Sequence, residues 1–320
     1  MDSKAENFPI LRLAIEIKAD TPLEIPPYPG STLRGTLGGA LKKICCISKQ
    51  QTCDDCLIKS SCIYVYVFET PMLTDSSLGL RFRHAPHPFV LDVPVEETKV
   101  LLKPGDTWSF GITVFGQAIT WLPYVVAAVE KMGQLGIGRG RGKFQVNEIW
   151  SIDENGKTTE LIYSDGTFKF PEKVLNLQDL GKGKQKLGNG RFRLTFMTPL
   201  RLQFRGELVN VPEFHILVGN LLQRISLVVK VHSDMEFPDL SKEFIPIARE
   251  VKIVENNTSW YDWRRYSHRQ GKKMPFGGII GSVIYEGDPS LFEPYLSAGT
   301  IFHVGKNTGF GLGRYEWEYV

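Results

Sequence analysis

Hydrophobic residues alternate and then recur at helical spacing through the first half of the chain. The stretch ILRLAIEIK, residues 10–18, places Leu11, Leu13 and Ile15 on one face of a predicted strand. Apolar residues between 33 and 44 then recur at the spacing of an amphipathic helix, with Ser31 as its predicted N-cap. This half is completed by predicted strands over 64–70, 88–92 and 107–115, a helix over 120–136 and a strand that ends at Trp150.

The second half repeats this order of elements. The predicted elements are a strand over 191–197, a helix over 211–231, strands over 250–256 and 277–287, a short helix over 289–299 and a strand over 314–320. Both halves therefore give the order β-α-β-β-α-β of the ferredoxin-like fold, and an internal duplication explains the repetition. We predict an α+β protein of two tandem ferredoxin-like (RRM-like) domains, 1–150 and 191–320, with 151–190 as a linker or hairpin.

Each half carries a glycine-rich loop before its last strand. The first is GIGRGRGKFQV, residues 136–146, and the second, GKNTGFGLG, occupies 305–313. Such loops expose backbone N–H groups that can contact an anion. A dinucleotide site needs a strand before the loop and a helix after it, whereas here the order is reversed, and the spacing of a nucleoside triphosphate loop is absent. The neighbouring cations instead favour a polyanion bound along its backbone, with Arg139, Arg141, Lys143, Lys306 and Asn307 as the predicted contacts. The alternative is a glycine-rich β-bulge without a ligand.

The net charge of +3 identifies no partner, but the basic residues are clustered. Residues 181–206 contain seven Lys or Arg and no acid, and residues 260–273 contain five with one acid. In the second cluster Arg264, Arg265 and Arg269 alternate with Trp and Tyr, a pattern suited to phosphates and unpaired bases. Solvated arginines beside buried aromatic residues are the alternative. A small-molecule metalloenzyme finds no support, because no H-E-x-x-H or paired-carboxylate motif stands out.

All five cysteines fall between positions 45 and 62. Disulfide-rich secreted proteins spread their cysteines along the chain, so this clustering favours a metal. Four thiolates suit tetrahedral zinc in a structural role, and an iron–sulfur cluster or reduced thiols are the alternatives. We predict that a Cys-rich insertion, 45–62, binds zinc through Cys46, Cys53, Cys56 and Cys62, with Cys45 an alternative first ligand.

Three segments together resemble a known family. GKNTGFGLG near the C-terminus, DWRRYSHRQGKKMPFGGIIGSVIYEGD before it and YPGSTLRGTLGGAL in the first half are similar to the RAMP superfamily of CRISPR-associated proteins. Within it, the chain resembles the endoribonucleases that process precursor CRISPR RNA. The resemblance implies metal-independent cleavage of a repeat RNA, in which the 2′-hydroxyl attacks the adjacent phosphate and a mature guide RNA results. It equally allows a non-catalytic RAMP subunit that binds RNA in a CRISPR effector complex.

Cleavage of this kind needs a base, an acid and a cation near the phosphate. Many members of the family carry a catalytic histidine near the first helix, but residues 1–83 contain none. Among the six histidines of the chain, His303 beside the second glycine loop and His232 at a helix end are the candidates, with Lys306 as the cation. The expected partners are CRISPR repeat RNA and other CRISPR-associated proteins. The N-terminus lacks the features of a signal peptide and no membrane span is expected, so a cytoplasmic protein is predicted.

Overall fold

The computed structural model describes residues 5–48, 52–70, 85–180, 190–262, 264–267 and 272–320. Contacts within the chain divide it into two compact units. We call Phe8–Leu175 together with Leu227–Met235 the N-terminal unit. The C-terminal unit is Asn176–Ser226 and Glu236–Val320, joined by the N-terminal 3₁₀ turn Ala5–Asn7.

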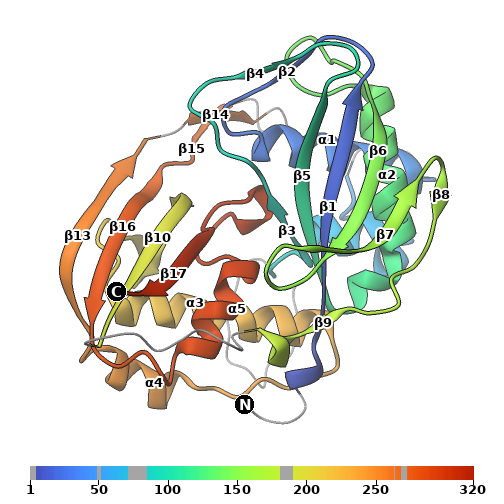
Figure 1. The fold of residues 1–320 in the computed structure, drawn as a ribbon. Helices are drawn as coiled ribbons and strands as arrows, with labels where there is room; N and C mark the ends of the chain where they lie inside the picture. Colours follow the sequence, from blue (N-terminus) through green and yellow to red (C-terminus); the bar gives the residue numbers. More distant parts are fainter. Residues whose placement is uncertain (1–4, 49–51, 71–84, 181–189, 263, 268–271) are drawn as a thin grey trace. The chain divides into compact units, whose positions relative to one another are not determined.

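The N-terminal unit has the element order and strand order of a ferredoxin-like fold. Its elements are β1 (Pro9–Ala19), α1 (Gly30–Cys45), β3 (Phe89–Asp92), β5 (Thr107–Phe115), α2 (Leu122–Leu135) and β6 (Phe144–Ile152). The antiparallel sheet runs β3-β5-β1-β6 and is extended beyond β6 by β7 (Thr158–Ser164) and β8 (Thr167–Phe168). Strand β9 (Leu175–Asn176) also pairs with β1, and β2 (Leu23–Ile25) with β4 (Val100–Leu102) forms a separate two-stranded sheet. Figure 1 shows the strands of this sheet side by side, with β1 between β5 and β6.

The C-terminal unit repeats this order with a second sheet. Its elements are β10 (Arg191–Leu200), α3 (Phe214–His232), β13 (Lys252–Tyr261), β16 (Gly278–Glu286), α5 (Glu293–Phe302) and β17 (Tyr315–Tyr319). The sheet runs β13-β16-β10-β17, which is the same strand order as in the N-terminal unit. Helix α4 (Ser241–Ala248) and the hairpins β11–β12 (Gln203–Phe204, Glu207–Leu208) and β14–β15 (Arg264–Ser267, Lys272–Pro275) are additions. The prediction of two tandem ferredoxin-like folds is therefore confirmed.

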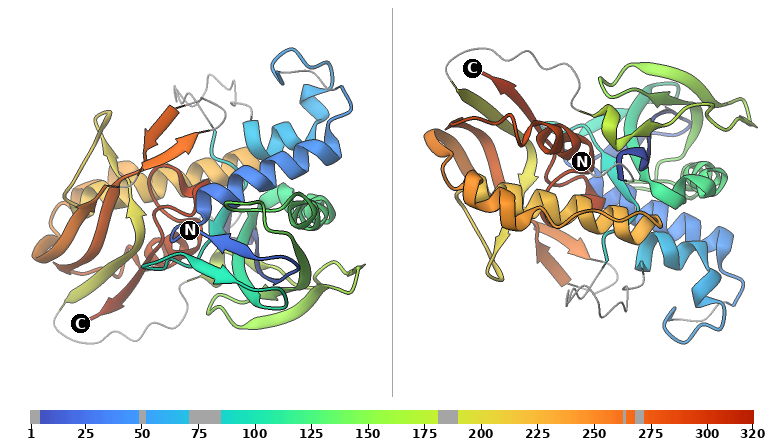
Figure 2. Two further views of the ribbon diagram at one scale, coloured as in Figure 1. Left: turned by 90° about the horizontal axis from the view of Figure 1, so that it is seen from above. Right: turned by 90° about the horizontal axis from the view of Figure 1, so that it is seen from below.

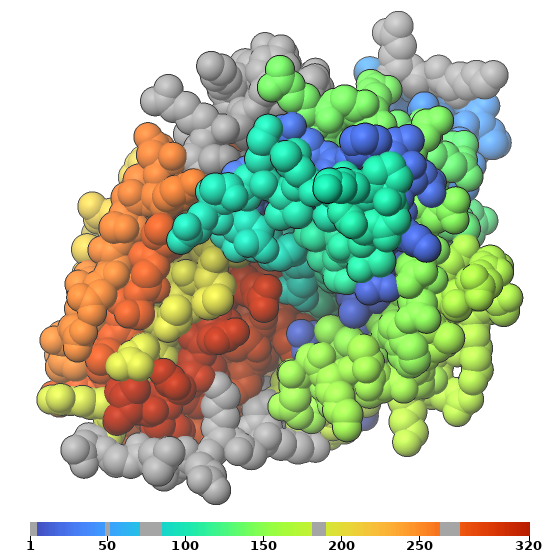
Figure 3. Space-filling model, turned by 45° about the horizontal axis from the view of Figure 1, so that its top comes forward, coloured from blue at the N-terminus to red at the C-terminus, as the bar shows by residue number. Residues whose placement is uncertain are grey.

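The outer edge of the second sheet is open. Strand β13 is exposed along most of its length, and it forms the orange ridge of the space-filling view (Figure 3). The inner strand β10 instead alternates between buried and more exposed residues over most of its length, as expected for a sheet with one covered face.

Helix α3 is long and apolar enough, by length and composition alone, to cross a membrane. Most of its apolar residues are buried, however, with Leu217, Leu221 and Ile225 each 0% exposed, and its sequence includes Arg224 and Lys230. These features are those of a core helix in a folded domain. Its last turn, from Leu227, belongs by its contacts to the N-terminal unit.

Two local predictions were wrong. Helix α1 begins at Gly30, and its N-cap is Pro29 without a side-chain cap, so Ser31 lies inside the first turn. Residues 65–69 form a π-helix rather than a strand, and Val65, Val67 and Phe68 within it are buried. An apolar run this short does not distinguish a strand from a buried helical turn.

The glycines inside α1 are not equivalent. A Cβ at Gly38 would lie 3.0 Å from the ring of Phe68, so the π-helix packs directly on the α1 backbone at this point. Gly35 and Gly39 have nothing within 4 Å of such a Cβ. Among these three glycines, Gly38 is therefore the position where another element packs closely on the α1 backbone.

The boundary between the two units lies near residue 175. The segment after β6 is not a free connection, since β7 pairs with β6 and β8 pairs with β7. Residues 176–180 belong to the C-terminal unit, and residues 181–189 lie outside the described part of the chain.

Candidate nucleic-acid interface

The first glycine loop forms a tight turn over strand β2. Ile137 and Gly142 make an antiparallel bridge that closes the loop, and Glu24 forms a bridge with Arg139. Gly138 has φ +69°, and a Cβ there would collide with the carbonyl oxygen of Glu24. The sequence uses glycine at this position because the backbone must pass directly against β2.

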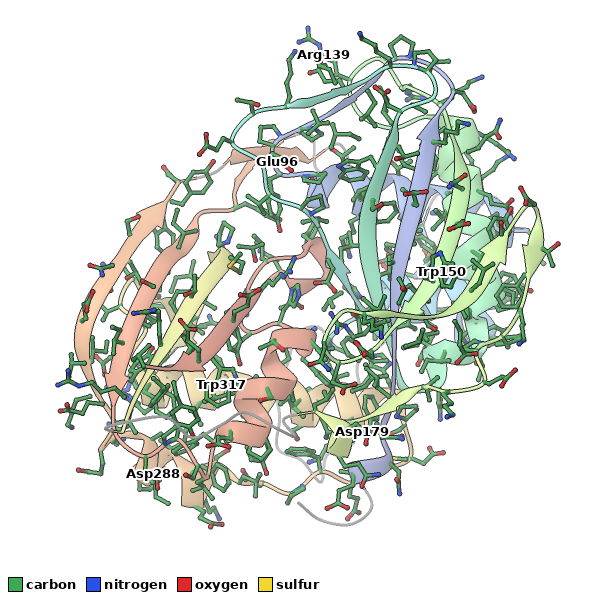
Figure 4. The ribbon with its side chains drawn as sticks, viewed as in Figure 1. Glu96, Arg139, Trp150, Asp179, Asp288 and Trp317 are labelled. Carbon is green, nitrogen blue, oxygen red and sulfur yellow. The ribbon has the colours of Figure 1, made fainter. Side chains whose placement is uncertain are left out.

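This turn holds three cations at the surface. Arg139, Arg141 and Lys143 are all exposed, and Figure 4 shows Arg139 pointing outward from the loop. In the part of the chain that the structure describes, none of the three side chains forms an ion pair or a hydrogen bond. Their charges are therefore available to an external anion, and their contact with RNA stays a prediction.

The second glycine loop is anchored to the end of β10. The backbone N–H of Lys306 donates to the carbonyl of Arg201 at 3.0 Å, and Gly305 pairs with Arg201 in a parallel bridge. Gly305 has φ +85°, and a Cβ there would collide with the same carbonyl. Asn307 takes a left-handed conformation at φ 65° and begins the 3₁₀ turn Thr308–Phe310. This geometry leaves the side chain of Lys306 exposed and that of Asn307 half-buried.

Arg201 was not among the site residues predicted from the sequence. Its guanidinium donates to the carbonyl of Gly277, which lies immediately before β16. Since its own carbonyl binds Lys306, Arg201 connects the second glycine loop to the base of the β14–β15 hairpin. Its Nε is buried and has no partner within the described residues, and burial lowers the pKa of the guanidinium. The feature of the sequence that could have identified Arg201 is its position directly after strand β10.

The basic aromatic stretch forms the end of the β13–β16 hairpin. Trp260 and Tyr261 at the end of β13 are 42% and 48% exposed, so they are not the core residues of the alternative interpretation. Arg264 and Arg265 lie in β14, whose backbone alone is described, and Arg269 lies outside the described residues. Exposed aromatic rings suit stacking on unpaired bases.

The two histidines proposed for catalysis are buried. His303 is 0% exposed, and its Nδ1 lies 3.2 Å from the carbonyl of Leu312 within the C-terminal unit. His232 is also 0% exposed, and both of its ring nitrogens have protein partners in the N-terminal unit. In this conformation neither ring can touch an RNA phosphate, so their catalytic role stays a prediction. Lys306, by contrast, is exposed.

The ring of His232 holds two segments of the N-terminal unit together. Its Nε2 lies 2.8 Å from the carbonyl of Pro86, so that nitrogen carries the proton and donates. Its Nδ1 then accepts from the hydroxyl of Tyr66 at 3.1 Å. Burial raises the pKa of Tyr66 to about 12, so this hydroxyl stays protonated. His232 therefore links the segments that carry Tyr66 and Pro86.

The remaining described histidines differ in their surroundings. His87 lies 2.9 Å from the guanidinium of Arg34, and both side chains are half-buried. His215 lies 3.3 Å from the carboxylate of Glu213, and burial together with the nearby charge of Arg249 lowers its pKa. His84 and His268 lie outside the described residues.

The cysteine segment has no core of its own. Between Lys42 and Tyr64 no described residue is buried, and Leu57 is 96% exposed. In Figure 2 this light-blue segment extends past the C-terminal end of α1. A coreless insertion is the kind of segment that a metal can fold.

The thiols lie near one another without converging. The hydroxyl of Ser48 lies 3.9 Å from the sulfur of Cys46 and 3.6 Å from that of Cys56. Burial, with the nearby Cys62 and Cys46, raises the pKa of Cys45 to about 11. No group of three or more His, Cys, Asp or Glu side chains in the described residues is arranged to hold a metal ion. The donor chemistry fits zinc, whereas this arrangement of the sulfurs does not complete a site.

Comparisons with known proteins cover both units. The domain family AF_1859_N, described as an N-terminal domain, matches residues 8–180, which is more than half of the chain. The family of CRISPR-associated endoribonuclease Cas6 matches residues 194–315. A protein of Archaeoglobus fulgidus, described as uncharacterised, is 24% identical over 295 residues, or 91% of this chain and 92% of that protein.

Solved structures show the same fold. Thermus thermophilus Cas6 is 12% identical with a TM-score of 0.56, over 97% of this chain and 98% of that one. A Cas6 product complex has the same TM-score at 14% identity, over 96% and 99% of the two chains. A partial Cas6-RT-Cas1–Cas2 complex gives 0.59 at 11% identity, over 98% of this chain and 47% of that one. The chain therefore belongs to the AF_1859_N family, and its residues 194–315 are similar to the family of CRISPR-associated endoribonuclease Cas6.

Proposed function

We propose that this protein is a metal-independent endoribonuclease that cuts CRISPR repeat RNA and releases mature guide RNA. The 2′-hydroxyl of one nucleotide attacks the adjacent phosphate, which leaves a cyclic phosphate and a free 5′-hydroxyl. One observation carries the proposal: a C-terminal unit of the Cas6 endoribonuclease family holds its glycine loop and exposed Lys306 on a tandem ferredoxin-like framework.

RNA binding follows from the exposed groups of each unit. Arg139, Arg141 and Lys143 offer three charges on one turn, and Lys306 offers another on the second loop. Each such cation neutralises one phosphate and releases condensed counterions, a gain that does not depend on base sequence. Trp260 and Tyr261 supply the stacking surface that unpaired bases require.

The proposed catalytic groups differ in their exposure to a bound RNA. Lys306 offsets the negative charge that builds on the phosphate during attack. For His303 or His232 to act as base or acid, the ring must leave its buried position, since both are 0% exposed here. A half-buried histidine, His87, is an alternative acid–base group.

The direct test uses purified protein with the repeat RNA of its own genome. Cleavage at one position within the repeat, in excess EDTA, is the expected result. An RNA of the same length and composition with the repeat scrambled is the matched control and should remain intact. If the repeat were cut only after a divalent cation is added, metal-independent cleavage would be wrong.

A non-catalytic RAMP subunit is the second candidate function. The burial of His303 and His232 favours it, because it leaves two of the expected acid–base groups inside the protein. Such a subunit would bind repeat RNA tightly, leave it intact and copurify with other CRISPR-associated proteins. The same EDTA experiment, run with a binding assay on the same sample, separates the two functions.

We propose further that zinc folds the cysteine segment through Cys46, Cys53, Cys56 and Cys62. The support is the confinement of all cysteines to a segment whose described residues are not buried. The sulfurs would have to draw together, and thiols would lose protons as they do so. The protein is proposed to act in the cytoplasm, where its RNA is made, and with other CRISPR-associated proteins as partners.

A further inference from the structure

A compact polar cluster lies on helix α1 of the N-terminal unit. Arg34 is on the second turn of α1, His87 lies two residues before β3, and Thr70 follows the π-helix. The guanidinium of Arg34 lies 2.9 Å from Nε2 of His87, and the hydroxyl of Thr70 lies 2.9 Å from Nδ1. Residues far apart in sequence thus converge on one imidazole.

The hydrogen bonds fix the protonation of this imidazole. The Thr70 hydroxyl gives its proton to the carbonyl of Tyr66 at 3.0 Å, so towards His87 its oxygen can only accept. Nδ1 of His87 must therefore carry the proton. Arginine is a donor only, so Nε2 faces Arg34 with its lone pair. His87 is held as a neutral ring whose basic nitrogen lies beside a fixed positive charge.

Packing holds this arrangement from several sides. The His87 ring stacks on Phe89 with centroids 6.0 Å apart, and the Arg34 guanidinium lies 5.4 Å from the ring of Phe68. His232 binds the carbonyl of Pro86, the residue before His87. The buried His232 therefore orients the segment that carries His87, which gives it a positioning role without contact with RNA.

His87 also differs from the other described histidines. His232 and His303 are fully buried, and His215 faces the carboxylate of Glu213. Of the histidines in the described ranges, His87 combines a half-buried ring with a cation at hydrogen-bonding distance. A base next to a cation is the pair of groups that attack on a phosphodiester requires.

We infer that His87 and Arg34 are catalytic residues for RNA cleavage, an assignment that rests on the proposed function. A bound phosphate offers Arg34 better acceptors, so the guanidinium turns to the phosphate oxygens and releases Nε2 of His87. Nε2 takes the proton of the 2′-hydroxyl as its oxygen bonds to phosphorus. The bond from phosphorus to the 5′ oxygen breaks, and the proton is returned to that oxygen. The step consumes no water and needs no co-reactant.

The test is single-turnover cleavage of the repeat RNA in EDTA, with binding measured in parallel. H87Q keeps an acceptor towards Arg34 and much of the volume but cannot take a proton, so cleavage should slow by about 10²–10⁴-fold with binding within about threefold. R34Q should slow it by about 10²–10³-fold, the usual loss of one transition-state donor. H215Q, another half-buried histidine, is the matched control and should cleave at the wild-type rate.

The outcomes separate this assignment from the proposed function. A wild-type protein that cuts, with H87Q and R34Q cutting equally fast, would overturn the assignment alone. A wild-type protein that binds the repeat but never cuts it would overturn both. If a variant loses its fold by circular dichroism, H87A and R34K are measured instead, and wild-type cleavage by both of these would also overturn the assignment.

Discussion

Removing the cations of the first glycine loop should change how RNA binding depends on salt. The perturbation is the triple variant R139A/R141A/K143A, which deletes three exposed charges that form no ion pair in the described chain. Each phosphate contact to single-stranded RNA contributes about 0.7 to the slope of log K against log salt. Three lost contacts should therefore reduce the slope by about 2 and weaken binding about 50-fold at 0.15 M salt.

The assay is fluorescence anisotropy with labelled repeat RNA over a range of salt concentrations. The control variant is K59A/K99A/K169A, which removes the same net charge from the same unit. Each of these lysines is already paired with a carboxylate, at 3.3, 3.1 and 2.8 Å respectively. The control should leave the slope unchanged to within about 0.5. Equal slopes for both triple variants would refute the reasoning, since RNA would then sense net charge and not this loop.

Three further predictions follow from the local geometry. G35A should stabilise the protein by about 1 kcal/mol, the usual preference for Ala over Gly in a helix. G38A should instead destabilise it, because its Cβ would lie 3.0 Å from the Phe68 ring. Urea denaturation measures the free energy of unfolding of both variants. H303A should lower the melting temperature and leave the cleavage rate of the folded fraction unchanged, because the ring is 0% exposed. A cleavage rate that falls by about 10²–10⁴-fold at an unchanged melting temperature would instead identify acid–base catalysis by His303. Protein purified without chelator should contain about one zinc per chain, and C53S/C56S should contain almost none by elemental analysis; a wild-type protein without metal would end the zinc proposal.

The fold was predictable because its signals are local and repeated. The alternation in β1 and the helical spacing in α3 follow directly from the sequence, and the glycine loops mark the same place in each half. The π-helix 65–69 was not predictable, since its five apolar-rich residues fit a strand equally well.

The candidate site was predictable only in part, for a physical reason. Exposed cations such as Arg139 and Lys306 lie on glycine turns that the sequence marks directly. Whether a histidine is buried depends on packing between distant segments, so the burial of His303 could not be read from its neighbours. The pairing of Arg34 with His87 joins residues 53 positions apart through a tertiary contact that no local pattern encodes.

The measurement that bears most directly on the central claim is analysis of the RNA ends produced in EDTA. The repeat RNA is incubated with the protein, and the masses of its fragments are measured by mass spectrometry. The control substrate is the same RNA with a 2′-deoxy nucleotide at the cleavage position. The account predicts a 2′,3′-cyclic phosphate and a 5′-hydroxyl, and a deoxy RNA that is bound but intact. Fragments with a 3′-hydroxyl and a 5′-phosphate, or cleavage of the deoxy RNA, would contradict it.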